Sequence, residues 1–243
     1  MSKIVAIVQA RMGSSRLPGK VLMDIAGKSV LAHCIERLAR AGRIDEIVVA
    51  TTEHAEDMAI HEAATALGAK TFAGSESDVL NRYRAAAEWA KADIVVRVTS
   101  DCPLIDPEIT DNVIEAYLES EVDLASNVIR RTFPRGVDTE VLSVDMLRYL
   151  DGFVKKPEER EHVTMHLYQN QEQFWLASVE TEGPMHRPEL RFCVDTEADL
   201  DFMRTVFKKI DAADNLFPIF EAVKLIEREP KLADINAHVE QVS

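Results

Sequence analysis

The chain has 243 residues, with 42 acidic and 28 basic side chains and a formal charge of −14. Hydrophobic residues make up 47% and charged residues 29%, which excludes a disordered or collagen-like chain, and the acidic total argues against a general nucleic-acid binder. No stretch approaches the roughly 18 consecutive apolar residues of a membrane span, and the N-terminal apolar run is too short for a signal sequence. Because the three cysteines also lack a Cys-x-x-Cys spacing, we expect a globular protein of the reducing cytoplasm.

Short β-branched runs alternate with amphipathic stretches through the first half of the chain. The strands predicted there are Ile4–Val8, Ile44–Thr51, Thr71–Phe72, Ile94–Thr99 and Asp123–Ser126. The helices predicted between them are Ser29–Ala41, Glu53–Leu67, Val79–Ala92 and Pro107–Leu118. This alternation predicts an α/β fold, with a mostly parallel twisted sheet and helices on both faces.

After Ser126 the regular alternation ends. The strands predicted in this part are Thr139–Leu142, Phe174–Val179 and Leu190–Val194. The helices predicted are Glu158–Gln169, Glu197–Lys209 and Ile219–Arg228. No linker or repeat is visible, so we expect one domain over residues 1–243, in which residues 127–190 form an insertion-like region for acceptor binding or dimerisation.

A basic, glycine-containing loop follows the first predicted strand. Residues 1–43 contain eight basic and two acidic side chains, so this segment carries +6 while the other 200 residues carry −20. Within it, the loop at 9–20 combines glycines and serines with the cations Arg11, Arg16 and Lys20, at the sheet edge where α/β folds bind ligands. Its spacing fits neither a Walker A loop nor a G-x-G-x-x-G fingerprint. We interpret it as a phosphate cradle of another kind, the alternative being a solvated basic loop.

Two aspartates follow predicted strands on the same sheet edge. Asp101 comes after Ile94–Thr99, and Asp195 comes after Leu190–Val194. Mg²⁺ prefers hard oxygen ligands and usually takes one or two carboxylates together with phosphate oxygens and water. The pair therefore indicates a magnesium site, although Asp101 could be a turn residue and Asp195 the residue before a helix cap.

Several segments of the sequence resemble one enzyme family. They are QARMGSSRLPGKVL at 9–22, DEIVVATT at 45–52, GSESDVLNRY at 74–83, VTSDCPLIDP at 98–107, REHVT at 160–164 and LRFCVDTEADL at 190–200. Together they resemble the cytidylyltransferases that make CMP-activated sugar acids, such as the 3-deoxy-manno-octulosonate and acylneuraminate cytidylyltransferases. The branch they resemble most is the spore-coat polysaccharide biosynthesis protein F group.

The resemblance implies a nucleotide-diphospho-sugar-transferase-like (Rossmann-like) fold and Mg²⁺-dependent transfer of CMP from CTP to an acidic acceptor, with release of pyrophosphate, in surface polysaccharide synthesis. It implies catalytic roles for Arg11, Lys20 and Asp101, and metal binding by Asp101 and Asp195. The nucleotide-binding residues that it implies in the loop are Gln9, Ala10, Arg11, Met12, Gly13, Ser14, Ser15, Arg16 and Lys20.

Four further residues are candidates for the nucleotide side of the site. Thr51 ends a predicted strand, where its hydroxyl could approach the base or ribose of the nucleotide or make a hydrogen bond within a local turn. Asp78 and Arg82 lie in a matching segment, the alternative being a helix cap and a solvated arginine. Arg97 stands inside an apolar strand, so it should point into the site or pair with a carboxylate, because an unpaired buried charge is costly.

The acceptor side offers weaker signals. Arg160, Glu161 and His162 match the second-half motif and could contact the acceptor. The irregular middle segment contains Asn127, Arg130, Arg131 and Arg135, where a cation would suit a carboxylate or phosphate on the acceptor, the alternative being a solvated loop. His162 and His166 are spaced i, i+4, but the order is wrong for H-E-x-x-H and no third zinc ligand has sensible spacing.

Two other functions stay open at this stage. The enzyme could use another nucleoside triphosphate, since related folds do, or the chain could be a nucleotide- or sugar-binding module without turnover. The acceptor itself is not identifiable, whether a sugar acid or a small phosphorylated acid, and family resemblance makes a homodimer plausible.

Overall fold

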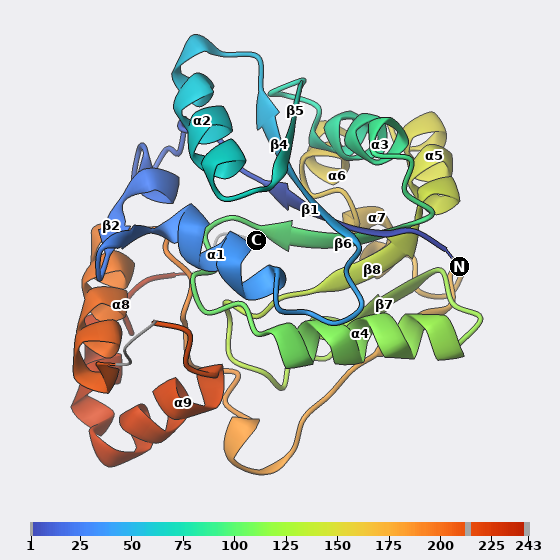
Figure 1. Cartoon of the computed structure of the whole chain (residues 1–243). Helices are drawn as coiled ribbons and strands as arrows, with labels where there is room; N and C mark the ends of the chain where they lie inside the picture. The colour runs from blue at the N-terminus through green and yellow to red at the C-terminus, as the bar shows by residue number, and fades with distance from the viewer. Residues whose placement is uncertain (1, 212–214, 241–243) are drawn as a thin grey trace.

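The computed structural model describes residues 2–211 and 215–240, and a seven-stranded sheet lies at its centre (Figure 1). In spatial order the strands are β5 (Lys70–Gly74), β4 (Glu46–Thr52), β1 (Ile4–Gln9), β6 (Ile94–Thr99), β8 (Glu140–Ser143), β7 (Leu124–Ser126) and β9 (Leu176–Ser178). The first four are parallel, β8 runs antiparallel to both of its neighbours, and β9 is parallel to β7. The predicted α/β fold with a mostly parallel sheet is confirmed.

Both faces of the sheet are covered by helices, so its central strands are buried on both sides. On β1, Ala6 and Val8 face one core while Val5 and Ile7 face the other. The first core is completed by α1 (Val30–Leu38), α2 (Met58–Ala66) and α4 (Pro107–Glu119). The second is completed by α3 (Val79–Trp89), α5 (Val144–Phe153) and α7 (Met165–Gln169).

A third core lies beside the sheet, where the orange and red helices of Figure 1 pack next to a small hairpin. Its helices are α8 (Glu197–Ile210) and α9 (Ile219–Arg228), followed by the 3₁₀ helix η4 (Pro230–Ile235). The hairpin consists of β2 (Asp24–Ile25) and β3 (Lys28–Ser29). This core contains buried Phe192 and Val194, so it fixes the segment that leads to Asp195. No helix of the described residues has the length and hydropathy needed to span a membrane.

The structure corrects two predicted elements and adds several, among them the helix α5 and the hairpin of β2 and β3. The segment 190–194 is not a strand, because it forms only a single bridge from Arg191 to Arg135; its apolar residues reflect burial in the third core. The helix predicted over 158–169 is two short helices, α6 (Pro157–Glu161) and α7, separated at Val163 with φ +51°. Helix α5 was not predicted from the sequence, and Ser143 caps it by accepting a hydrogen bond from the backbone N–H of Met146.

Most other elements match their predictions to within a few residues at each end. β6 and α9 have the predicted limits. α2 begins five residues later than predicted, because the 3₁₀ helix η2 (Ala55–Asp57) occupies the preceding turn.

Candidate active site

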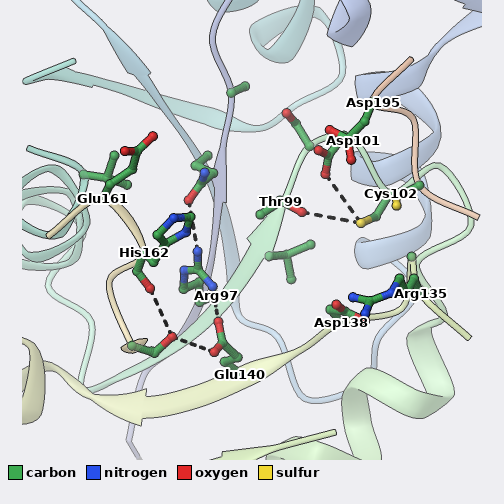
Figure 2. Close-up of a pocket in the computed structure, with 18 of the residues that line it drawn as sticks. Arg97, Thr99, Asp101, Cys102, Arg135, Asp138, Glu140, Glu161, His162 and Asp195 are labelled. Carbon is green, nitrogen blue, oxygen red and sulfur yellow. Dashed lines mark hydrogen bonds and ion pairs between the residues drawn. The ribbon is translucent and has the colours of Figure 1, made fainter. Parts of the chain in front are cut away.

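A pocket of about 740 Å³ opens at the carboxyl ends of β1 and β6 (Figure 2). Asp101 and Asp195 lie on one side of it, and Arg97 with Glu140 on another. The candidate residues that line this pocket are Gln9, Ala10, Arg11, Ser14, Ser15, Arg16, Lys20, Arg82, Arg97, Asp101, Arg135, Glu161, His162 and Asp195. The candidates outside its lining are Met12, Gly13, Thr51, Asp78 and Asn127. The basic loop, the strand-end aspartate and parts of the middle region therefore meet at one place.

Backbone hydrogen bonds fold the basic loop upon itself. The carbonyl of Met12 accepts from the N–H groups of Ser14 at 2.8 Å and Gly19 at 2.9 Å. Gly19 has φ +73°, a conformation that glycine adopts without a steric penalty. The N–H of Met12 donates to a carboxylate oxygen of buried Asp57 at 2.7 Å, and Thr52 bonds the other oxygen. Asp57 thus ties the loop to the β4–α2 connection, a role that no local pattern in the sequence indicates.

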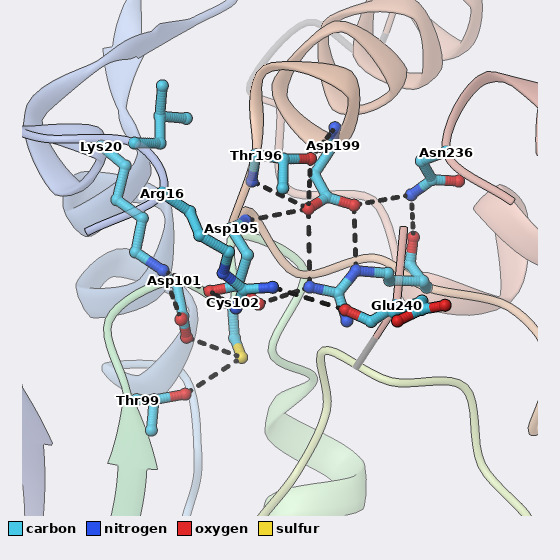
Figure 3. A network of polar contacts seen from close by, with 12 residues as sticks. Arg16, Lys20, Thr99, Asp101, Cys102, Asp195, Thr196, Asp199, Asn236 and Glu240 are labelled. Carbon is cyan, nitrogen blue, oxygen red and sulfur yellow. Dashed lines mark hydrogen bonds and ion pairs between the residues drawn. The ribbon is translucent and has the colours of Figure 1, made fainter. Parts of the chain in front are cut away.

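Lys20 forms an ion pair with both aspartates at once (Figure 3). Its Nζ lies 2.8 Å from Asp101 Oδ2 and 2.7 Å from Asp195 Oδ1, and the residue is only 8% exposed. Burial alone would lower the pKa of Lys20, but the two carboxylates raise it well above its ordinary value. Burial likewise opposes ionisation of Asp101, yet the ammonium of Lys20 holds the pKa of that carboxyl below its ordinary value.

The same two carboxylates fit a divalent cation. Because Asp101 and Asp195 lie on either side of a single ammonium, their oxygens converge on one cationic centre. Within the described part of the chain, no group of three or more His, Cys, Asp or Glu side chains is arranged to hold a metal. Mg²⁺ is usually bound by one or two carboxylates, while phosphate oxygens and water occupy its other coordination positions. The two aspartates therefore fit that ion.

Asp195 sits in irregular backbone just before α8, and not at a strand end as predicted. Thr196 caps that helix, and Asp199 completes a capping box, so the predicted alternative for Asp195 describes its local structure correctly. Its carboxylate nevertheless faces the pocket, where Oδ1 also lies 3.0 Å from the guanidinium of Arg16. The residue before a helix cap is thus also part of the site.

Another part of the pocket contains an ion pair between Arg97, which is largely buried, and Glu140, which is buried. Glu140 also accepts hydrogen bonds from the hydroxyl of Thr164, at 2.6 Å, and from that of Tyr168. Arg97 therefore both lines the pocket and pairs with a carboxylate, which are the two alternatives predicted from its position in an apolar strand.

Residues 131–138 form a further wall of the pocket. Arg131 binds Asp138 through two hydrogen bonds of 2.8 and 2.7 Å, whereas the guanidinium of Arg135 has no hydrogen bond or ion pair with any described residue. Gly136 lets this wall approach the segment before Asp195, because a Cβ at Gly136 would lie 2.7 Å from the carbonyl carbon and oxygen of Phe192. This wall therefore places the guanidinium of Arg135, which has no ion pair with a described residue, in the same pocket as Asp101 and Asp195.

Two candidate residues, Asp78 and Asn127, do not line the pocket and instead bind neighbouring parts of the chain. Asp78 caps α3 and pairs with Arg160, which corresponds to the helix-cap alternative, and Arg160 does not line the pocket. Asn127 bonds the backbone of Val137 and Thr139, so it holds the loop beside Arg135.

Two more nucleotide-side candidates are buried. Thr51 lies in β4, and its hydroxyl has no hydrogen-bond partner among the described residues. Arg82 lines the pocket and donates to the carbonyl of Ser75 at 2.6 Å, so it is not the solvated arginine of the alternative reading.

The fold and the pocket place the chain in a known class. A mostly parallel sheet with a basic loop and two carboxylates at its carboxyl edge suits transfer of a nucleotide group. The sequence model described as cytidylyltransferase matches residues 5–226. The chain belongs to the cytidylyltransferase family and is a nucleotidyltransferase.

Relatives and solved structures agree with this assignment. An uncharacterised protein of Methanocaldococcus jannaschii is 34% identical over 241 residues, which cover 99% of this chain and 97% of the relative. The spore coat polysaccharide biosynthesis protein SpsF of Bacillus subtilis is 27% identical over 96% of this chain and 98% of its own length. A cytidylyltransferase structure from Leptospira borgpetersenii superposes with a TM-score of 0.91 at 30% identity, covering 100% of both chains.

A more distant structure shares the fold. CMP:2-keto-3-deoxy-manno-octonic acid synthetase, solved in complex with CTP, superposes with a TM-score of 0.67 at 22% identity. The match covers 86% of this chain and 100% of that structure.

Proposed function

We propose that this cytidylyltransferase transfers CMP from CTP to an oxygen of an acidic acceptor, releasing pyrophosphate, with Mg²⁺ as cofactor. The observation that carries the proposal is the convergence of Lys20, Asp101 and Asp195 next to the basic loop in one pocket. CTP is the nucleotide bound in the synthetase structure of the same fold. A binding module without turnover would not need two carboxylates, Asp101 and Asp195, placed to bind a metal ion beside the ammonium of Lys20.

The chemistry is substitution at the α-phosphorus of CTP, in which the acceptor oxygen forms the new P–O bond and the bond to pyrophosphate breaks. Asp101 and Asp195 would hold Mg²⁺, which neutralises charge on the phosphate oxygens when it is bound. Arg11, Arg16 and Lys20 line the same pocket and offset the negative charge of the leaving pyrophosphate. Nucleotidyl transfer depends mainly on such positioning and charge stabilisation.

The acceptor proposed is a sugar acid or a similarly small phosphorylated acid. Its support is the guanidinium of Arg135, which has no ion pair with any described residue and lies on the pocket wall formed by residues 131–138, because arginine suits bidentate binding of carboxylate or phosphate. The names of two relatives refer to a sugar acid and to a spore-coat polysaccharide. We therefore assign the product to surface polysaccharide synthesis, and residues 127–190 to acceptor binding.

Pyrophosphate release tests this function. It should require CTP, Mg²⁺ and an acidic acceptor together, and chelation of Mg²⁺ should abolish it. Lys20→Met and Asp101→Asn should each lower kcat by about 100- to 1,000-fold, since each removes charge stabilisation at the reacting phosphates. Lys28→Met is the matched control, because Lys28 forms an ion pair with Glu36 outside the pocket.

Unchanged turnover in Lys20→Met and Asp101→Asn would contradict the mechanism. Tight CTP binding without turnover over a broad panel of acidic acceptors would instead favour the binding module.

A further inference from the structure

The two carboxylate oxygens of Asp195 have different surroundings (Figure 3). Oδ1 faces the pocket, where it contacts the ammonium of Lys20 and the guanidinium of Arg16. Oδ2 is bound on the other side by the guanidinium of Arg191, which is itself buried. Arg191 thus fixes Oδ2 of Asp195, while Oδ1 remains directed at the pocket, where it could bind a metal ion.

Arg191 is in turn fixed by a second carboxylate. Its Nε lies 2.9 Å from Oδ1 of Asp199, a residue with no exposed surface. The other oxygen of Asp199 accepts hydrogen bonds from the backbone N–H groups of Asp195 and Thr196, both at 3.0 Å. Asp199 therefore holds both the side chain that binds Asp195 and the backbone that carries it.

Asn236, far along the chain, binds both members of this pair. Its side-chain amide donates to Oδ1 of Asp199 at 3.0 Å and to the backbone carbonyl of Arg191 at 3.1 Å. The residue is 4% exposed, follows η4 directly, and lies beyond residues 5–226 that the family model matches. Both N–H donors of the amide are used, so the contact defines one orientation of Asp199 and Arg191.

The same C-terminal segment also reaches the basic loop. The backbone carbonyl of Glu240 accepts a hydrogen bond of 3.4 Å from the guanidinium of Arg16, which is the arginine that contacts Asp195 Oδ1. Residues 236–240 therefore contact the surroundings of Asp195 from both sides of its carboxylate.

We propose that Asn236 is a positioning residue for the metal site. It fixes Asp199 and Arg191, which together hold the carboxylate of Asp195 with one oxygen directed at the cation. The inference rests on the proposed function, since the metal is part of it. Residues behind metal ligands commonly change metal affinity by about 10- to 100-fold when they are replaced, because they set the orientation of the ligand.

The test compares metal response with overall stability. Asn236→Ala and wild-type protein are saturated with α,β-methylene CTP, which cannot release pyrophosphate, and Mg²⁺ is titrated while Tm is followed. We expect the Mg²⁺ concentration that gives half of the Tm increase to rise about tenfold in the variant. The Mg²⁺ requirement for turnover should rise in parallel, while the KM for CTP at saturating Mg²⁺ stays within about twofold.

Two controls separate positioning from a merely structural contact. Ile226→Val shortens a buried side chain of α9 and so lowers stability without touching the pair of Asp199 and Arg191. Asn170→Ala removes a side-chain hydrogen bond of 2.7 Å to the backbone carbonyl of His166, away from the aspartates. Both controls should keep the Mg²⁺ midpoint of the wild type even where Tm falls.

The variant Asn236→Asp distinguishes hydrogen bonding from packing. Aspartate has nearly the size of asparagine but would direct a carboxylate oxygen at Asp199, so we expect its Mg²⁺ midpoint to rise at least as much as that of Asn236→Ala. A wild-type midpoint in either Asn236 variant would overturn the inference and leave the proposed function standing. A wild-type protein whose Tm does not respond to Mg²⁺ would overturn the metal site of the proposed function as well.

Discussion

At the scale of single residues, the site depends on charges that are buried but paired. Lys20 is almost inaccessible, and its ammonium is stabilised because Asp101 and Asp195 both contact it. Two carboxylates so close to each other would repel without a cation between them. Lys20 therefore offsets this repulsion when no ligand is bound.

Arg97 and Glu140 form a second, largely buried ion pair in the pocket, and they allow a stability prediction. Glu140→Ala should lower the free energy of unfolding by about 3 kcal/mol, because it leaves the largely buried charge of Arg97 without its partner. The measurement is urea denaturation of both proteins. Glu115→Ala removes the partner of Arg43 in an exposed ion pair and should cost less than about 1 kcal/mol. Equal losses in the two variants would show that burial does not govern the contribution of these pairs.

At the scale of elements, a cluster of ion pairs joins α3, α5 and α6. Asp151 of α5 pairs with Arg160 of α6 and, at 2.7 Å, with Nε of Arg84 in α3. Arg160 also pairs with Asp78, the cap of α3. The short helix α6 has only five residues, too few to be stable alone, so these contacts help to fix it beside the pocket.

The pKa of Asp151 predicts how stability depends on pH. Burial alone would raise this pKa, but Arg160 and Arg84 hold it below its ordinary value of 3.8. A carboxyl with a lowered pKa in the folded state contributes stability above its unfolded pKa and loses it as the pH falls through the folded value. Asp151→Asn should therefore be less stable than wild type at pH 7, and the difference should shrink as the pH falls below about 3.8 and through the lower pKa of the folded state.

Denaturant unfolding of both proteins between pH 7 and pH 2.5 measures this difference. Asp145→Asn is the control, because Asp145 is 87% exposed and its pairing with Arg148 should contribute little at any pH. If the difference between wild type and Asp151→Asn is the same at every pH, ionisation of Asp151 is not its cause.

At the scale of the whole molecule, charge and architecture act together. The cations of the basic loop and the two carboxylates come from distant parts of an acidic chain, and the carboxyl edge of the sheet brings them together. The third core then places the segment before α8 against this edge, so Asp195 reaches Lys20 and Asp101, which come from the first half of the chain.

Ligand binding at this site should stabilise the whole fold. At 100 times its Kd, CTP with Mg²⁺ should add about 2.7 kcal/mol, or roughly 5–10 °C in Tm for a chain of this length. UTP, GTP and ATP at the same concentration should give smaller shifts, as measured by differential scanning fluorimetry. In Asp101→Asn the part of the CTP shift that depends on Mg²⁺ should be lost. Shifts of equal size for all four nucleotides would contradict the choice of CTP and favour the alternative nucleotide.

Local patterns in the sequence were sufficient for much of this description. The alternation of buried strands and amphipathic helices predicted the sheet, and the sequence after β1 and β6 predicted the basic loop and Asp101 at its carboxyl edge. Such features are readable because they depend on residues close together in the chain. The predicted strand at 190–194 was wrong for the same reason, since an apolar run reports burial and not the backbone conformation.

Only the tertiary structure decided how distant residues share the site. Asp57 holds the basic loop, Lys20 lies between Asp101 and Asp195, and Asn236 contacts the pair behind Asp195. Each of these contacts joins residues at least 37 positions apart. No periodicity or spacing encodes them, because they arise where separate segments of the chain pack together at the carboxyl edge of the sheet. The sequence by itself determined the parts of a nucleotide site, and packing determined which of its charges meet.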